Sequence, residues 1–363
     1  MLLTLISTIF VLGILVLIHE LGHFITAKKL NVKVDIFSIG MGPKVFGVTR
    51  GETEYRISAV PIGGYVKMAG EDVEEMLKEN PDPEIKNDDP RNFNNQTKIK
   101  RSLIIIAGSI ANIFLGTVIF LLIFITGVPT LTTKIGTVME NSPAERAGIK
   151  PNDRITAIDK KPLWKWDEMT KIIQESAGKP LMLTIERDTV NIELEITPET
   201  QGKTNIGIIG ISSSYDFVKE RYGLMTAAAK ALEQTWVIGT SIIKGIYLMI
   251  AGKIKAEVAG PLGIIKITGE QAKQGFINLL FFTALLGINL GIINLFPVPP
   301  LDGGVILFLL IEKIKGSPVK LKHQLIAQQV GWALLLFLLF FASYNDIIKF
   351  YLPSIKSLPF WGK

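Results

Sequence analysis

The chain has 363 residues, of which 48% are hydrophobic and only 20% are charged, and its formal net charge is +6. A soluble protein of this length usually has about a quarter charged residues, so the composition argues against a soluble enzyme and excludes a disordered chain. Cysteine is absent, which excludes disulfides, a thiol nucleophile and cysteine metal ligands. The positive charges are spread along the chain, so we predict no nucleic-acid interface.

The hydrophobic residues are concentrated in four runs, each of at least about 20 residues, which is the length needed to cross the hydrocarbon core of a bilayer. The predicted membrane spans are residues 1–30, 101–128, 276–311 and 325–352. The first run does not read as a cleaved signal peptide, because no basic segment precedes it and no small-residue cleavage site follows it. The predicted fold class is a polytopic α-helical membrane protein with about four transmembrane helices.

Basic residues gather beside these spans. They follow the first span, precede the second and separate the third from the fourth, at positions 28–33, 98–101 and 313–322. The positive-inside rule places all three groups in the cytoplasm. Four spans then leave both termini and residues 129–275 outside, in a multi-pass protein of the inner (plasma) membrane.

The connecting segments differ in their predicted character. Residues 70–100 and 312–324 are expected to be cytoplasmic loops, and residues 201–275 an extracytoplasmic linker. Within that linker, charged residues interrupt the apolar stretch 225–252 at a spacing that suits one polar helix face. This predicts an interfacial helix, because a fifth span would place the next group of lysines outside.

The first span contains the sequence His19-Glu20-Leu-Gly-His23. Positions i and i+4 lie on one face of a helix, so both imidazoles can bind one cation while Glu20 lies beside them to take a proton from water. This is the metalloprotease arrangement, and it predicts one zinc ion per chain. The alternative is a pair of core histidines, but ionisable groups in an apolar span are costly and usually functional.

A catalytic zinc ion needs a third protein ligand and an open position. Asp302 is the better candidate, because it is the only charged residue between 276 and 311 and follows prolines that interrupt the helix. The remaining histidine, His323, lies in a lysine-rich neighbourhood and is expected to be a solvated loop residue. The alternative role for Asp302 is that of a helix N-cap.

The His-Glu-Leu-Gly-His motif, together with the segment from Asn294 to Gly303, resembles the site-2 proteases, which are intramembrane zinc metalloproteases. The match is closer to the bacterial branch that contains the regulator of sigma-E protease. Further stretches similar to that branch are residues 37–67, 108–112 and 260–264. The resemblance implies zinc ligands at His19, His23 and Asp302, a catalytic base at Glu20, and a substrate site lined by Asn112, Asn294, Pro297 and Pro299.

Two of these features have a separate physical basis. An asparagine in an apolar span can hydrogen-bond a substrate backbone, or it can join neighbouring helices; the resemblance favours the first role. Residues 31–69 resemble the family's membrane-associated β-loop, and an exposed sheet edge there would hold a substrate extended by strand addition. The alternative for this segment is a plain structural hairpin.

Residues 129–200 differ in composition from the spans and resemble one extracytoplasmic α+β PDZ domain. The expected elements are strands at 136–140, 149–158, 181–185 and 190–196, and helices at 142–148 and 166–176. PDZ domains bind extended peptides by strand addition, so a peptide ligand is expected, and a spacer is the alternative. Proteobacterial relatives have two such domains, so their size-filter role is not carried over.

The predicted function is that of an intramembrane zinc endopeptidase with its active site near the cytoplasmic face. The resemblance implies single-span substrates that an upstream site-1 protease has already cut, such as an anti-sigma factor or a remnant signal peptide. The alternatives are a membrane metal transporter and an inactive scaffold that binds membrane segments. Glu20 discriminates against the transporter, because transport needs no general base, and the intact motifs discriminate against the scaffold.

Overall fold

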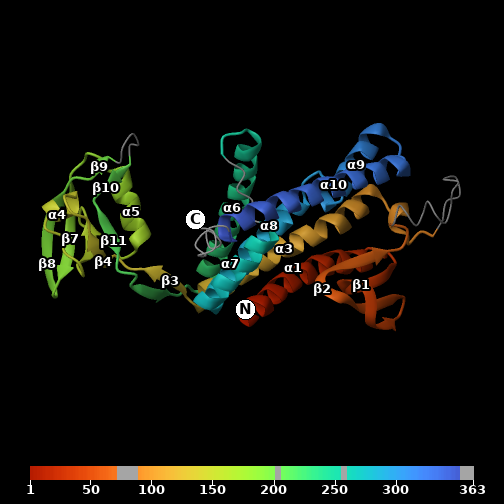
Figure 1. Ribbon diagram of the computed structural model, residues 1–363, viewed down its shortest axis with the longest axis horizontal. Helices are drawn as coiled ribbons and strands as arrows, with labels where there is room; N and C mark the ends of the chain where they lie inside the picture. Colours follow the sequence, from red (N-terminus) through yellow and green to blue (C-terminus); the bar gives the residue numbers. More distant parts are fainter. Residues whose placement is uncertain (72–88, 201–205, 255–259, 352–363) are drawn as a thin grey trace, which may run out of the picture. The chain divides into compact units, whose positions relative to one another are not determined.

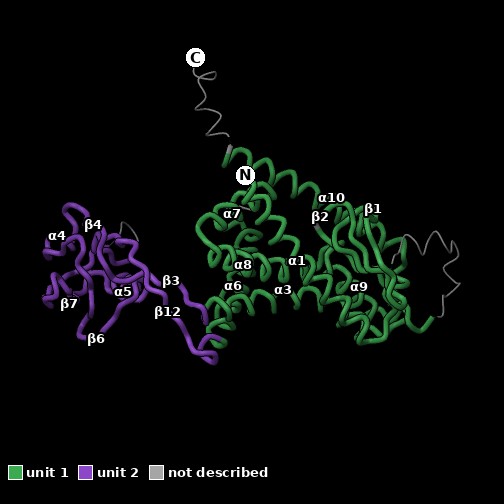
Figure 2. The backbone as a smooth tube through the Cα atoms, turned by 90° about the horizontal axis from the view of Figure 1, so that it is seen from below, with its two compact units in different colours: residues 1–123, 228–363 green, residues 124–227 purple. Residues whose placement is uncertain are grey.

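The computed structural model describes residues 1–71, 89–200, 206–254 and 260–351 (Figure 1). The chain divides into two compact units (Figure 2). Unit 1 comprises residues 1–123 and 228–363, and unit 2 comprises residues 124–227. Most of the expected cytoplasmic loop, residues 72–88, lies outside the described residues, as does the end of the expected fourth span after residue 351.

Four of the described helices are long and apolar enough to cross a membrane, as predicted. They are α1 (Leu2–Lys29), α3 (Lys98–Thr126), α8 (Phe276–Asn294) and α10 (Leu321–Asp346), the last continued by a π-helical turn, η2 (Ile347–Tyr351). The helices approach closely at small residues, as helices in membranes commonly do. A methyl group on Gly22 of α1 would lie 2.4 Å from the carbonyl oxygen of Ala107 in α3, and one on Gly291 of α8 would lie 2.7 Å from that of Ser109.

The expected third span, residues 276–311, is two helices rather than one. α8 ends at Asn294, a proline-containing turn follows, and α9 runs from Asp302 to Lys315. Proline lacks a backbone donor and restricts the residue before it, so the run of prolines ends the first helix. Of these two helices, only α8 is long and apolar enough to span a membrane.

Two further helices lie wholly or mostly in the described part of unit 1. α6 (Leu224–Ile250), whose first turn belongs to unit 2, forms where an interfacial helix was predicted, and it is not among the candidate spans. α7 (Pro261–Gln274) lies in the segment expected to be a linker and packs against α1, where Gly269 contacts Thr4. The buried carboxylate of Asp346 in α10 accepts hydrogen bonds from the backbone N–H groups of Gly260 and Gly263, at 3.1 and 2.7 Å. It thereby satisfies two backbone donors at the first turn of α7.

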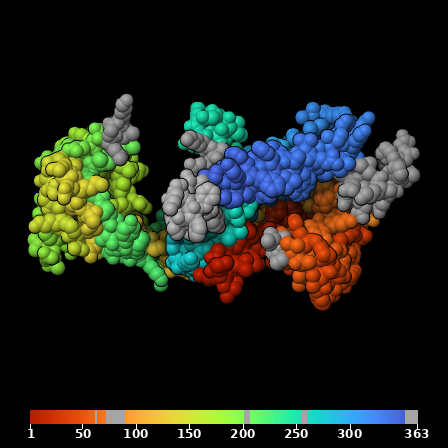
Figure 3. Space-filling view, in the orientation of Figure 1, coloured from red at the N-terminus to blue at the C-terminus, as the bar shows by residue number. Residues whose placement is uncertain are grey.

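A two-stranded sheet follows α1 and packs against it. β1 (Val34–Arg50) and β2 (Thr53–Met68) have a register that shifts repeatedly, which bends the pair. Residues 36–39 pair with 64–67 and also with 54–57, so the segment 64–68 forms an edge of the described sheet. The sheet is a separate lobe, orange in Figure 3. Its exposed apolar side chains are Ile39, Met41, Val45, Phe46, Val48, Ile57 and Val60.

Charged contacts fix this sheet to the end of α1 and to the segment before α3, which contains the short helix η1 (Phe93–Asn95). Glu52, in the turn between the strands, accepts hydrogen bonds from Lys28 at 2.6 Å and from Arg91 at 2.6 Å with each carboxylate oxygen. The hydrogen bond from Lys28, followed by those from Arg91, lowers the pKa of Glu52 to about 2. The sheet is therefore anchored at its turn rather than only through its contact with α1.

Unit 2 is an α+β domain with its own hydrophobic core, centred on Ile135, Ile155, Leu183 and Ile185. β5, β6, β7 and β8 form one sheet in the order β6-β5-β7-β8, and β3, β4 and β9 each pair with a later strand. Its strands are β3 (Val128–Leu131), β4 (Ile135–Val138), β5 (Arg154–Ile158), β6 (Lys161–Pro162), β7 (Leu181–Arg187), β8 (Val190–Ile196), β9 (Glu199–Thr200), β10 (Gly207–Ile208), β11 (Ile211–Ser213) and β12 (Phe217–Glu220). Its helices are α4 (Pro143–Arg146) and α5 (Trp166–Glu175).

The expected domain boundary at residue 200 is too early. β11 pairs with β4 and β12 pairs with β3, so residues assigned to the linker return to complete the domain. Lys165 and Glu220 add an ion pair of 2.8 Å between the start of α5 and β12. These strands are only three and four residues long, and strands so short carry little periodicity to predict them from sequence.

Candidate metal centre

His19 and His23 project from the same face of α1, as their spacing predicts. Their Nε2 atoms are 3.1 Å apart, and both residues are less than 10% exposed. The Nδ1 atom of His23 lies 2.9 Å from the carbonyl oxygen of Ile104. Because a carbonyl can only accept, this contact requires the proton on Nδ1 and leaves the Nε2 lone pair directed at His19 and Asp302.

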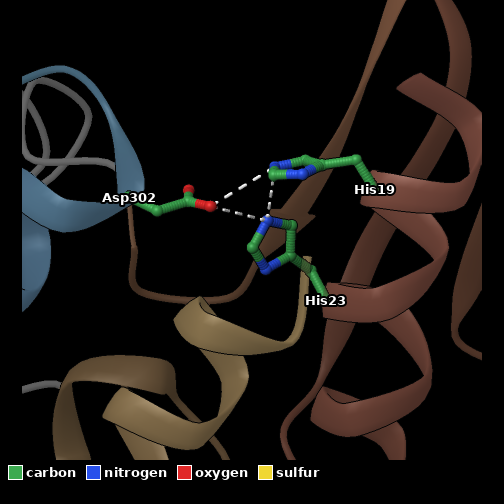
Figure 4. A group of neighbouring side chains, drawn as sticks. All are labelled: His19, His23 and Asp302. Carbon is green, nitrogen blue, oxygen red and sulfur yellow. Dashed lines mark hydrogen bonds and ion pairs between the residues drawn. The ribbon is translucent and has the colours of Figure 1, made fainter. Parts of the chain in front are cut away.

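Asp302, the first residue of α9, completes the cluster (Figure 4). Its Oδ2 atom lies 3.3 Å from His19 Nε2 and 3.7 Å from His23 Nε2. The glycines that follow it allow the turn to fold back closely. A methyl group on Gly303 would lie 2.1 Å from the carbonyl oxygen of Phe296, and one on Gly304 would lie 2.6 Å from the backbone nitrogen of Pro299.

The donor atoms of His19, His23 and Asp302 fit a zinc ion. They all lie within 4.8 Å of one another. Zinc–nitrogen and zinc–oxygen bonds of about 2.0–2.1 Å in a tetrahedral arrangement place neighbouring donors about 3.3 Å apart, and the observed separations are 3.1, 3.3 and 3.7 Å. Two imidazoles and one carboxylate are also the donor types of catalytic zinc sites.

Helix α3 forms the third wall of this cluster. The hydroxyl of Ser109 donates a hydrogen bond of 3.2 Å to Asp302 Oδ2. A methyl group on the neighbouring Gly108 would lie 2.3 Å from His23 Nε2 and 2.9 Å from His19 Cε1. From the sequence, Gly108 was noted only as part of a motif and Ser109 had no predicted role. A glycine at position 108 allows α3 to approach both imidazoles of α1 closely. This role depends on how the two helices pack, so the sequence alone does not indicate it.

Glu20 lies beside the cluster without belonging to it. Among the described residues, the group of possible metal donors contains only the two histidines and Asp302. The Glu20 side chain is partly buried and faces the edge of β2, because its Cγ lies 3.3 Å from where a methyl group on Gly64 would be. Its carboxylate accepts a hydrogen bond from the backbone N–H of Val66 in β2. His323 is exposed and does not join the cluster, as expected, but it lies in the first turn of α10 rather than in a loop.

The predicted substrate-site residues have different environments. Asn112 is one helical turn beyond Gly108 on α3, is 1% exposed, and its Oδ1 atom has no hydrogen-bond partner among the described residues. Asn294 ends α8 and is partly buried, Pro297 is exposed, and Pro299 is partly buried. Their substrate roles stay predictions, and the partnerless amide oxygen of Asn112 is the observation that bears on them.

The fold and the donor cluster define a polytopic membrane protein with a zinc-type centre among its helices. Residues 7–338 match the family model described as Peptidase family M50. The zinc metalloprotease RasP of Oceanobacillus iheyensis is 32% identical, over 96% of this chain and 100% of that protein. The regulator of sigma-W protease RasP of Bacillus subtilis is 30% identical, over 96% of this chain and 99% of that protein.

The chain belongs to peptidase family M50, the site-2 protease family. The predictions of a metalloprotease and of zinc as its cofactor are therefore confirmed, and the transporter and scaffold are not favoured.

Proposed function

We propose that the chain is an intramembrane endopeptidase that cuts the transmembrane segment of a single-span protein already shortened by an upstream site-1 protease. The observation that carries this proposal is the convergence of His19, His23 and Asp302 at 3.1–3.7 Å, with Glu20 beside them. An anti-sigma factor and a remnant signal peptide are the substrates we expect. The Bacillus subtilis relative is named for regulation of a sigma factor, which supports the first.

In this proposal His19, His23 and Asp302 hold the zinc ion. When bound, the zinc ion would act as a Lewis acid: it would polarise the scissile carbonyl and lower the pKa of a bound water toward about 7. Glu20 accepts the proton of the attacking water and passes it to the leaving amine. Ser109 orients the Asp302 carboxylate through its hydrogen bond of 3.2 Å. The carbonyl of Ile104 fixes the tautomer of His23.

The β1–β2 sheet is proposed to hold the substrate extended. A peptide bond inside a helix is shielded by its hydrogen bonds and side chains, so cleavage requires local unwinding. The edge segment 64–68 pairs only with β1 in the described sheet, and Gly64 lies against Glu20. A substrate strand added to this edge would lie beside the proposed base. The exposed apolar side chains of the sheet support its association with the membrane.

Asn112, Asn294, Pro297 and Pro299 are proposed to line the path of the substrate. The Oδ1 atom of Asn112 is buried without a partner among the described residues, so it can accept a hydrogen bond from a substrate N–H group. We further propose an inner-membrane location with the site near the cytoplasmic face and both termini outside. Unit 2 is proposed to be an extracytoplasmic PDZ domain that binds a peptide by strand addition, which its element order supports.

The test is cleavage of a tagged single-span substrate by the purified chain in detergent, with zinc measured in each variant. We expect Glu20→Gln to keep zinc but to lose at least about 100-fold in rate, the usual range for a general base. Asp302→Asn is expected to lose zinc, while His323→Gln is a matched control that keeps both zinc and activity. If Glu20→Gln cuts as fast as the wild type, the assignment of the base is wrong.

A further inference from the structure

An open cavity of about 530 Å³ lies between α3 and α9, and none of the three possible zinc donors lines it. One face of each helix lines it: Ile99, Leu103 and Ile106 on α3, and Ile306, Leu310 and Lys313 on α9. Each set follows the i, i+4, i+7 spacing of a single helix face. We call this feature the α3–α9 groove. Its volume lies in the range of about 300–1,000 Å³ that is common for small-molecule sites.

A shared hydrophobic cluster and an ion pair join the two helices on the inner side of the groove. Ile104 and Ile105 of α3 are buried in one hydrophobic cluster with Val305 and Ile306 of α9. Nearer the end of α9, Arg101 and Glu312 form an ion pair of 3.4 Å, in which both side chains are at most 15% exposed. The outer side remains open, since Leu103 and Leu310 are each 52% exposed.

Positive charge is concentrated at one end of the groove. Lys98 and Lys313 line it there. Lys98 donates a hydrogen bond of 3.0 Å to the backbone carbonyl of Glu312, and Arg101 and Lys98 lie 3.4 and 3.8 Å from the Glu312 carboxylate. Lys313 forms no ion pair with any residue that the structure describes. Three cationic groups thus face one carboxylate, which leaves the end of the groove with excess positive charge.

We infer that the α3–α9 groove binds one anionic phospholipid. Its acyl chain would lie along the isoleucine and leucine side chains, and its phosphate would lie between Lys98 and Lys313. Basic pockets beside transmembrane helices on the cytoplasmic side are suited to anionic headgroups, and α3 is the candidate span that borders this groove. A neutral lipid or an apolar substrate helix would use the same apolar walls, but it would leave Lys313 without a counter-charge and Lys98 with only the Glu312 carboxylate that it shares with Arg101. The inference rests on the proposed orientation of the spans and not on the protease chemistry.

The test is lipid titration of the purified chain in detergent, followed by native mass spectrometry. Phosphatidylglycerol is compared with phosphatidylcholine of the same acyl chains. A lysine near an anionic lipid surface contributes about 1 kcal/mol, which is about fivefold in affinity. We therefore expect Lys313→Gln to weaken phosphatidylglycerol binding about fivefold, and the double variant with Lys98→Gln to weaken it about 25-fold, with little change for phosphatidylcholine.

Lys315→Gln is the matched control, because it removes the same charge from the same helix at a position that does not line the groove. It is expected to change binding by less than about twofold. Equal binding of the two lipids, or an equal loss in Lys315→Gln and Lys313→Gln, would overturn the inference. So would displacement of the lipid by a neutral single-span peptide, since the groove would then be a substrate surface. Glycerol phosphate alone is expected not to compete, because it lacks the acyl chain.

Because lipid binding is measured without substrate, its failure is distinguishable from failure of the proposed protease function. Zinc content provides the folding control for each variant. Lys313 makes no ion pair within the described chain, so Lys313→Gln is expected to leave zinc unchanged. If the double variant loses both zinc and lipid, its fold is lost and its lipid binding is not interpreted. The comparison of Lys313→Gln with the wild type then decides whether the groove binds the anionic lipid.

Discussion

Replacing Gly108 by alanine is expected to abolish tight zinc binding while leaving the helices intact. The added methyl group would lie 2.3 Å from His23 Nε2 and 2.9 Å from His19 Cε1. Non-bonded heavy atoms separate to about 3.5 Å, so the imidazole of His23 must move by about 1 Å. Zinc–ligand distances tolerate only about 0.2 Å. The substitution therefore acts on the metal site and not merely on packing.

The size of the effect follows from the same geometry. Changes around metal ligands typically lower affinity by about 10- to 100-fold, and here both histidines are displaced, so we expect at least a 100-fold loss. Alanine is favoured over glycine inside a helix by about 1 kcal/mol, so α3 itself should not unfold. Zinc is measured per chain against a graded chelator, and helix content is measured by circular dichroism.

The matched control is Gly13→Ala in α1. Beyond the backbone of its own helix, no heavy atom of the described residues lies within 4 Å of the methyl group that this change adds, so zinc content and cleavage are expected to match the wild type. Loss of zinc together with loss of helix content in Gly108→Ala would point to misfolding instead. If Gly108→Ala binds zinc as tightly as the wild type, α3 does not wall the site as the structure places it, and the reasoning is refuted.

Two further predictions concern stability. Because the pKa of Glu52 is lowered, its ion pairs with Lys28 and Arg91 stabilise the fold fully above the ordinary pKa of 4.5. This stabilisation is lost as the pH falls toward about 2. A pKa difference of this size corresponds to about 3 kcal/mol, and solvent screening of the partly exposed carboxylate reduces it to about 1–2 kcal/mol. Glu52→Gln should therefore lower the unfolding temperature at pH 7 and match the wild type near pH 2; a constant difference across that range would contradict this. Asp346→Ala removes the carboxylate that accepts hydrogen bonds from the first turn of α7 and should lower the free energy of unfolding by about 1–3 kcal/mol, measured by denaturant unfolding. An unchanged midpoint would show that water replaces the lost hydrogen bonds.

Local spacing was sufficient to predict that two of the three donors of the metal centre lie together. His19 and His23 are four residues apart on one helix, and helix geometry alone places them on one face. The four spans followed from the length of the apolar runs, since a helix must satisfy its own backbone groups in lipid. Asp302 could be singled out because a lone carboxylate in an apolar segment is costly unless it has a partner.

The tertiary structure decided which distant segments meet. Ser109 and Asp302 are 193 residues apart in the chain, and their hydrogen bond depends on how α3 packs against the turn before α9. The same packing makes Gly108 a wall of the metal centre and creates the α3–α9 groove. Periodicity reports which face of a helix is apolar, but the partner of that face is set by close packing between segments.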